Sequence, residues 1–294
     1  MIDWTDAYNN MGHIPGGPDY PPRWMAEAAA FRAAMLAAGR AELDIPYGEK
    51  PRNRFDLFRP EGEPNGLLVF VHGGWWIAFE KSVWSHLAEG AVAAGWAVAM
   101  PSYTLAPDMR IAEITREIGQ AIEAAAKHGV GPIRLAGHSA GGHLVTRMVC
   151  RDTPLSAAVL ARIRRVTSIS GLHDLRPLMK IAANEKLRID AAEAQTESPA
   201  LLAPLPGTRV ACAVGAEERP EFLRQNDLLA NIWFGLEAKT SSLHIEGCHH
   251  FNVVDGMRDR ASALTRLMLC ETDYAFLCFR IFSSNPATTS LENV

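Results

Sequence analysis

The chain has 294 residues, and 48% of them are hydrophobic, which is enough to bury a sizeable core. Its formal net charge is −4, and its 29 Lys and Arg residues form no dense basic run, so neither nucleic acid nor an anionic membrane is expected as a partner. The start has no secretory pattern, and no apolar stretch reaches about 18 residues, so we expect a cytoplasmic protein. The five cysteines form no CxxC pair, which argues against a disulfide framework and against a zinc site.

Residues 1–40 mix Gly, Pro and aromatic residues before an alanine-rich helical stretch at 25–38, and they are predicted to form an arm that packs on the main domain. Short apolar runs then alternate with helical patterns, and six of these runs are predicted to be strands: 67–71, 97–100, 133–136, 166–169, 210–214 and 242–245. Between the second and third runs, four isoleucines three or four apart predict a one-faced surface helix.

Apolar strands that alternate with one-faced helices predict an α/β fold, with a mostly parallel sheet covered by helices on both faces. We expect a single domain over 1–270, with a helical insertion at 172–205. The remaining segment, 271–294, is predicted to be a partly disordered tail.

A GxSxG pattern centred on Ser139 lies where a strand pattern gives way to a helical one. A sharp strand-to-helix turn forces its central residue into a strained conformation and needs small neighbours. Serine in that place would present its hydroxyl above the edge of the sheet and act as a nucleophile. The alternative is a glycine-rich turn that only permits close packing.

A serine nucleophile requires a histidine base and an acid that orients it, and in α/β-hydrolases the order along the chain is Ser, acid, His. His250 is preferred as the base, with His249 second, because both follow the last predicted strand. Three other histidines downstream of the serine lie inside helical or strand patterns, where a structural role is expected: His143, His173 and His244.

The acid is expected at the end of the preceding strand. Glu218 is the first choice, Glu217 the second, and Asp174 a third that a loop would have to bring in. The alternative for each is an ordinary solvated charge. Cys248 is an alternative nucleophile, but no second motif supports it.

Six motifs together resemble an α/β-hydrolase of the arylformamidase (kynurenine formamidase) type, which is related to the hormone-sensitive-lipase-like esterases: HGGWW (72–76), SYTLAP (102–107), GHSAGGHL (137–144), SGLHDLRPL (170–178), EERPEFLRQ (217–225) and HHFNVV (249–254). The resemblance covers the chain from about Tyr8 to Cys270. It implies an α/β-hydrolase fold, an acyl-serine mechanism without a metal or cofactor, and roles for Ser139, Glu218 and His250. The chain differs in having glutamate where many relatives are expected to have aspartate.

In this topology the loop after the strand at 67–71 lies beside the nucleophile turn, and the backbone N–H groups of Gly73, Gly74 and Ala140 are expected to form the oxyanion hole. His72 is expected to brace this loop. Three aromatic residues are predicted to shape a pocket for a flat aromatic molecule, joined by Trp4 or Tyr8 from the arm: Trp75, Trp76 and Tyr103. One of the two tryptophans is expected to anchor the loop instead.

The sequence thus favours a serine hydrolase that cleaves a formamide or ester bond of a small aromatic substrate, with N-formylkynurenine as the best candidate and short-chain acyl or aryl esters as the alternative. A non-catalytic ligand receptor is disfavoured because serine and histidine are both present. A metal-dependent hydrolase is disfavoured because no HxxxH or HExxH pattern occurs. The expected partner is a small-molecule substrate, and a homodimer is compatible with the sequence.

Overall fold

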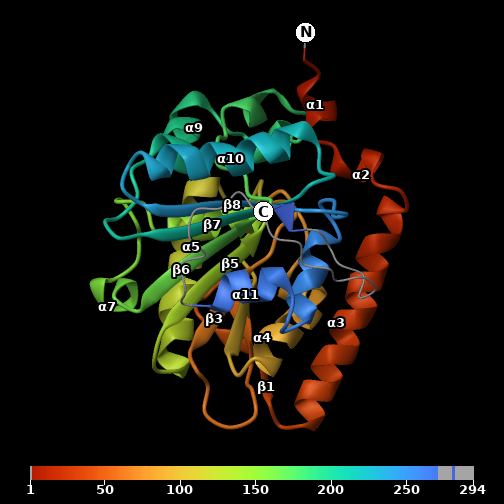
Figure 1. Ribbon diagram of the computed structural model, residues 1–294, viewed down its shortest axis with the longest axis vertical. Helices are drawn as coiled ribbons and strands as arrows, with labels where there is room; N and C mark the ends of the chain where they lie inside the picture. The colour runs from red at the N-terminus through yellow and green to blue at the C-terminus, as the bar shows by residue number, and fades with distance from the viewer. Residues whose placement is uncertain (1, 271–279, 282–294) are drawn as a thin grey trace, which may run out of the picture.

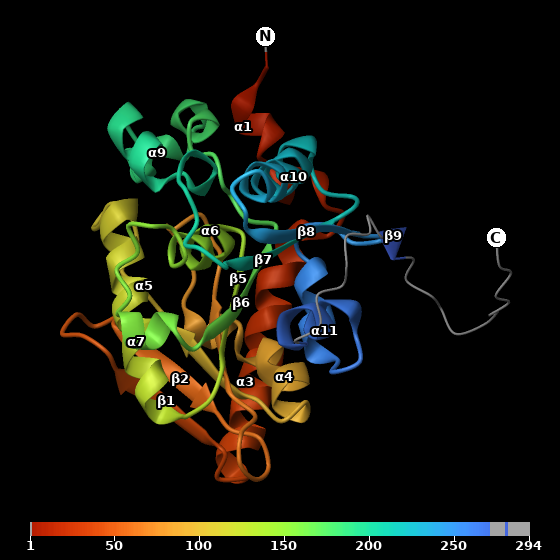
Figure 2. The same cartoon turned by 60° about the vertical axis from the view of Figure 1, so that its left-hand side comes forward.

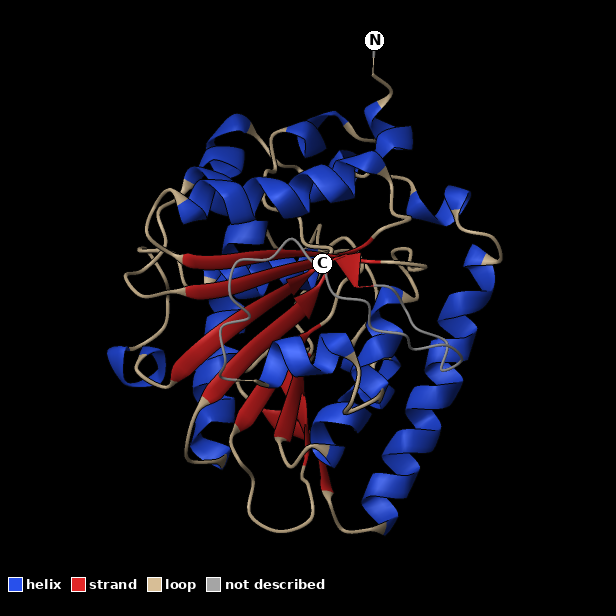
Figure 3. Ribbon diagram, in the orientation of Figure 1, coloured by secondary structure: helices blue, strands red, loops and turns tan. Residues whose placement is uncertain are grey.

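The structure is a computed structural model of the chain, and it describes residues 2–270 and the backbone of 280–281. A sheet runs through the middle of the molecule, and its strands fan out between two layers of helices (Figures 1 and 3). The predicted tail at 271–294 lies outside the described residues, apart from the short strand at 280–281.

Within the described residues, the sheet has nine strands in the order β1-β2-β4-β3-β5-β6-β7-β8-β9. The first two strands pair antiparallel, β2 also pairs antiparallel with β4, and every pairing from β4 to β9 is parallel. The strand bounds are β1 (Ala41–Pro46), β2 (Arg54–Phe58), β3 (Leu67–Val71), β4 (Ala97–Pro101), β5 (Ile133–His138), β6 (Ile163–Ile169), β7 (Arg209–Gly215), β8 (Lys239–Ile245) and β9 (Arg280–Ile281).

The α-helices are α1 (Trp4–Ala7), α2 (Asn10–His13), α3 (Tyr20–Ala37), α4 (Glu89–Ala93), α5 (Ile111–Ala125), α6 (Ala140–Arg147), α7 (Ala157–Leu160), α8 (Asn184–Leu187), α9 (Ala191–Glu197), α10 (Pro220–Phe234) and α11 (Ala263–Leu269). The 3₁₀ helices are η1 (Gly17–Asp19), η2 (Lys81–Val83), η3 (Ser85–Ala88), η4 (Ala126–His128), η5 (Pro177–Lys180), η6 (Pro199–Leu201) and η7 (Val253–Arg258). The segment predicted as a helical insertion holds η5, α8, α9 and η6.

Two hydrophobic clusters cover the two faces of the sheet. Helices α5, α6 and α10 contribute to one cluster, and α3, α4 and α11 contribute to the other. Figure 2 shows these two groups of helices on opposite sides of the sheet. The isoleucine stripe predicts α5 correctly, because Ile111, Ile114, Ile118 and Ile122 are all fully buried.

Four of the parallel strands end next to a segment that the sequence singled out. Strand β3 leads into the HGGWW loop, β5 into the GxSxG turn, β7 into the acidic segment, and β8 into the histidine pair. Because the carboxyl ends of parallel strands lie at one edge of a sheet, these four loops meet there. The fold therefore assembles the predicted site from positions more than 170 residues apart in the chain.

Candidate active site

Ser139 occupies the turn between β5 and α6, with φ 55° and ψ −117°, in the left-handed half of backbone space. This turn has no room for a side chain two positions before or two positions after the serine. A Cβ at Gly137 would lie 2.2 Å from the carbonyl oxygen of Gly141, and a Cβ at Gly141 would lie 2.0 Å from that of Val71. The two glycines of the GxSxG pattern are thus required by close backbone packing, and they allow the strained turn that presents the serine.

Glu218 and His250 form a hydrogen-bonded pair beside this turn. Nδ1 of His250 lies 2.7 Å from Oε2 of Glu218, and the side chains of both residues are almost completely buried. The other carboxylate oxygen, Oε1, accepts hydrogen bonds from the Gly215 N–H at 2.9 Å and from the Ser170 hydroxyl at 2.5 Å. The carboxylate is therefore held at both oxygens, and the imidazole is oriented by it.

His138, the residue before Ser139, packs against the same imidazole. Its Nε2 donates to the backbone carbonyl of His250 at 3.0 Å, and the two rings are 4.6 Å apart. Burial holds the pKa of His138 well below its usual range, so this ring is a neutral donor. Phe222 packs against the His250 ring with a centroid distance of 4.4 Å.

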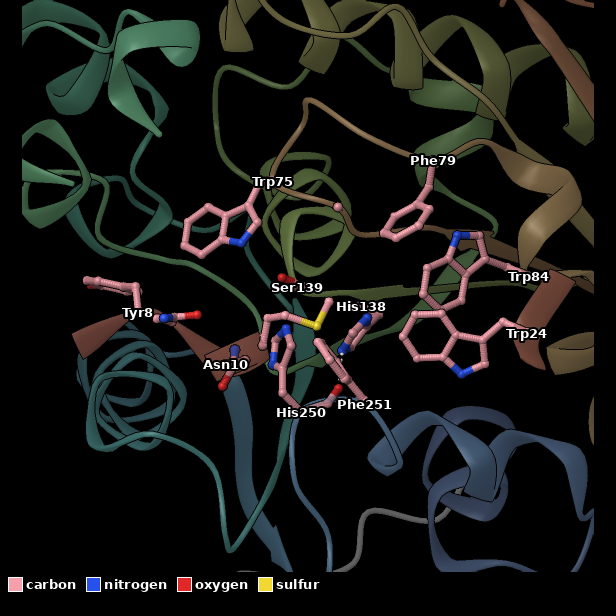
Figure 4. Close-up of a pocket in the computed structure, with 13 residues that line it drawn as sticks. Tyr8, Asn10, Trp24, Trp75, Phe79, Trp84, His138, Ser139, His250 and Phe251 are labelled. Carbon is pink, nitrogen blue, oxygen red and sulfur yellow. Dashed lines mark hydrogen bonds between the residues drawn. The ribbon is translucent and has the colours of Figure 1, made fainter. Parts of the chain in front are cut away.

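Ser139 and His250 line one cavity of about 170 Å³ (Figure 4). Since Nδ1 of His250 is engaged by the carboxylate, Nε2 is the ring nitrogen left for the serine and for substrate. Aromatic side chains form much of the remaining wall: Tyr8, Trp24, Trp75, Phe79, Trp84 and Phe251. The cavity thus combines a nucleophile, a base and an apolar lining.

The HGGWW loop lies against the nucleophile turn. A Cβ at Gly73 would lie 2.8 Å from the carbonyl oxygen of His138 and 3.0 Å from the Cβ of Ser139. Gly74 has φ +105° and lines the cavity. Within the described residues, the backbone N–H groups of Gly73 and Gly74 have no hydrogen-bond acceptor. They are free to bind an oxygen atom in the cavity.

His72 braces this loop, because its Nδ1 hydrogen-bonds the carbonyl of Gly73 at 2.7 Å and its ring stacks on Tyr103 at 4.5 Å. Burial lowers the pKa of His72 to about 4. It is therefore a neutral structural residue.

Two of the predicted pocket residues do not reach the cavity. Tyr103 is fully buried and donates its hydroxyl to the carbonyl of His72 at 3.1 Å. Trp76 is also fully buried and packs edge-on against His143 at 5.2 Å. This corrects the prediction that they bind substrate: Trp76 anchors the loop, and Trp75 alone of the pair lines the cavity.

The alternative residues for the base and the acid lie in other surroundings. His249 contacts the Tyr20 hydroxyl through Nε2 at 3.1 Å, and Glu217 is exposed. Asp174 forms ion pairs with Arg176 and Arg224. None of these three side chains takes part in the hydrogen bond between Glu218 and His250.

Cys248 does not line the cavity. Burial raises the pKa of its thiol to about 11, so it is not a thiolate near neutral pH.

The N-terminal arm supplies cavity residues that the sequence did not indicate, apart from Tyr8. Asn9, Asn10 and Met11 line the cavity together with Tyr8. Tyr8 fixes this segment, because its hydroxyl donates to Glu221 at 2.8 Å and accepts from Gln225 at 2.9 Å. The arm thus closes one side of the site.

Over residues 2–270 and 280–281, no group of three or more His, Cys, Asp or Glu side chains is placed to hold a metal ion. Within the same described ranges, no helix has the length and hydropathy that crossing a membrane requires.

Comparisons with known proteins agree with the fold. A family model described as "alpha/beta hydrolase fold" matches residues 68–203. The kynurenine formamidase of Danio rerio is 27% identical over 92% of this chain and 98% of its own length, and that of Salmo salar is 26% identical over 77% and 80%.

Solved structures agree with the family model on the fold. A crystal structure from Silicibacter sp. TM1040, which carries a provisional thioesterase name, is 50% identical, with a TM-score of 0.86 over 92% of this chain and 100% of that one. Esterase B from Lactobacillus rhamnosis shares the fold with a TM-score of 0.59 at 16% identity, over 79% of this chain and 90% of that one. The chain is an α/β-hydrolase, and it is similar over most of its length to kynurenine formamidases.

Proposed function

We propose that the chain is a metal-independent serine hydrolase that cleaves the formamide bond of a small aromatic substrate, with N-formylkynurenine as the best candidate. The observation that carries the proposal is the Glu218–His250 hydrogen bond beside the strained Ser139 turn, in one cavity. Nucleophile, base and orienting acid are the three parts that acyl transfer through serine requires.

In this mechanism His250 Nε2 takes the Ser139 hydroxyl proton as Oγ attacks the carbonyl carbon of the substrate. The imidazolium is stabilised by Glu218, and the proton is then given to the leaving amine as its bond to carbon breaks. Water, activated by the same imidazole, attacks the acyl-serine and releases formate and free enzyme.

The tetrahedral intermediate carries a negative oxygen that needs donors already in position. Gly73 and Gly74 offer unpaired N–H groups on one side of Ser139, and Ala140 begins helix α6 on the other. Each such donor is worth about 2.7–4 kcal/mol of transition-state stabilisation. The positive end of the α6 dipole adds to this field.

The aromatic lining supports an aryl substrate, since stacked or edge-on ring contacts add to the free energy gained by burying apolar area. A volume of about 170 Å³ supports a small one. The formamidase relatives support the formyl group. A carboxylesterase acting on short-chain acyl or aryl esters is the second candidate, because the same lining and the same acyl-serine chemistry accept an ester.

The test combines labelling with kinetics. A fluorophosphonate probe followed by mass spectrometry should modify Ser139 in the wild type and leave Ser139→Ala unlabelled. Lack of labelling in folded protein would overturn the serine mechanism. Steady-state kcat/KM values should then be compared for N-formylkynurenine, p-nitrophenyl acetate and an aryl thioester. A much higher kcat/KM for p-nitrophenyl acetate than for N-formylkynurenine would favour the carboxylesterase hypothesis.

A further inference from the structure

Asn10 is a largely buried polar residue in the cavity wall, and its side chain forms no hydrogen bond with the described residues. It begins helix α2 in the N-terminal arm and is 7% exposed. Its backbone is fully used, since the N–H donates to Tyr8 and the carbonyl accepts from Ile14. Within the part of the chain that the structure describes, neither Oδ1 nor Nδ2 of its carboxamide has a hydrogen-bond partner. Both polar atoms remain accessible from the cavity, so this carboxamide is available to a ligand.

The neighbouring asparagine shows the contrast. Asn9 caps the same helix by accepting from the Gly12 N–H at 3.0 Å, so its carboxamide has a structural use. Both asparagines line the cavity with Ser139 and His250, but the Asn10 carboxamide has no such structural use, and it lies on the His250 side of the cavity in Figure 4.

The segment that carries Asn10 is fixed to the body of the protein. Tyr8 is hydrogen-bonded to Glu221 and Gln225 of α10, and its ring packs edge-on against Trp75 at 6.0 Å. Asp6 forms an ion pair with Arg219 at 2.6 Å. A group held this way is preorganised, and a preorganised group can discriminate between substrates.

We propose that Asn10 is a specificity-determining residue whose Oδ1 accepts the N–H of the scissile formamide, so that the site favours N-aryl formamides over esters of the same shape. This inference rests on the proposed serine-hydrolase function. The leaving atom must lie within reach of His250 Nε2, since that nitrogen protonates it. A polar group on the same side of the cavity is therefore placed to contact the leaving atom.

A hydrogen bond from the scissile N–H to Oδ1 of Asn10 would assist the cleavage of the C–N bond. When Ser139 adds to the carbonyl, the amide nitrogen becomes tetrahedral and carries one hydrogen and one lone pair. An acceptor that binds the N–H turns the lone pair toward the protonated His250, which then transfers its proton as the C–N bond breaks and the arylamine leaves. An ester oxygen has no hydrogen to be bound, and it leaves Oδ1 of Asn10 unpaired.

The test uses 4-nitroformanilide and 4-nitrophenyl formate, which differ only in the scissile N–H or oxygen, with spontaneous hydrolysis subtracted. For Asn10→Leu, which keeps the size and removes the hydrogen bonds, we expect kcat/KM for the anilide to fall by about 10-fold and that for the ester to change by less than about 2-fold. Asn10→Asp keeps an oxygen in place of Oδ1 and should retain the amide preference.

The matched control is Asn231→Leu, the same replacement on the exposed face of α10, which should leave both rates and their ratio unchanged. A ratio that is equal in wild type and Asn10→Leu overturns the inference, as does an equal loss of amide preference in the Leu and Asp variants. If the wild type fails to cleave formamides or if Ser139 resists the fluorophosphonate probe, the proposed function itself fails. An unchanged ratio in an active formamidase refutes only the role of Asn10.

Discussion

Nδ1 of His250 lies 2.7 Å from Oε2 of Glu218, in a region that solvent barely reaches. The longer glutamate side chain is accommodated because the Gly215 N–H and the Ser170 hydroxyl hold its second oxygen. A buried carboxylate fixed at both oxygens keeps the imidazole in one orientation and favours the imidazolium that forms during catalysis.

Glu218→Gln should therefore lower kcat by about 10²–10⁴-fold with a small change in KM. The neutral amide fills the same space but does not stabilise a positive imidazole, and the defect appears only in the transition state. Steady-state kinetics with the preferred substrate measure both parameters.

Glu217→Gln is the matched control, because Glu217 is the neighbouring glutamate and is exposed. It should keep activity within about 2-fold of wild type, as surface substitutions away from such contacts are normally mild. A large loss in this variant, with Glu218→Gln still active, would move the acid to position 217.

The central strands and the chain order of Ser139, Glu218 and His250 could be predicted from the sequence. Parallel strands are buried on both faces, so β3, β4, β5 and β7 read as apolar runs. Functional residues in this topology follow the carboxyl ends of the strands. Because these ends lie at one edge of the sheet, the sequence alone predicts that the three side chains lie close together.

Strands β1 and β2 were not predicted. In β1 the side chains are mostly partly exposed or exposed, and β2 includes the buried Asp56, so neither gives a clean apolar run. The cavity wall was also missed in part. Trp24 and Trp84 meet at a ring distance of 4.7 Å although they are 60 positions apart. No local pattern encodes a contact between an arm helix and a loop of the sheet.

Trp75 and Trp76 are adjacent in sequence but have different surroundings, and substitutions should separate them. Trp75→Phe should raise KM or change selectivity between aryl substrates with little effect on stability, because Trp75 lines the cavity. Trp76→Phe should lower the free energy of unfolding by about 1–3 kcal/mol, because Trp76 is fully buried. Denaturant unfolding and kinetics on both variants check this. Equal effects of the two changes on KM would contradict the assignment.

Gly74→Ala should reduce both kcat and stability. The residue has φ +105°, and a Cβ would lie 2.5 Å from the carbonyl oxygen of Ala78. The loop must move to relieve this contact, and its N–H groups move with it, which weakens oxyanion binding by about 10²–10³-fold in kcat. Gly207→Ala is a control, since that position also has positive φ but has no atom within 4 Å of the added Cβ. The control should lose some stability through backbone strain and keep its kcat.

Five of the six buried histidines are held neutral by the fold. Burial lowers the pKa of His72, His86 and His143 to about 4 and that of His173 to about 3, and it holds the pKa of His138 well below its usual range. In the unfolded chain each should titrate near 6.5. Folding therefore excludes protons that the unfolded state binds at mildly acidic pH.

The free energy of unfolding should consequently fall as the pH drops from 6.5 toward 4, because the unfolded state binds more protons in that window. Each histidine contributes a slope of up to about 1.4 kcal/mol per pH unit. Carboxyl groups with lowered pKa values, such as Asp152 and Asp227, add to the loss only below about pH 5, so they do not account for the loss between pH 6.5 and 5. Urea unfolding at half-unit steps of pH measures the slope of the free energy of unfolding against pH.

His143→Gln keeps a donor for the Glu197 carbonyl, which His143 contacts at 2.6 Å. The variant has one fewer group that binds a proton on unfolding, so its slope should be smaller by the contribution of one histidine. An unchanged slope in this variant would show that His143 is not excluded from protonation in the folded state.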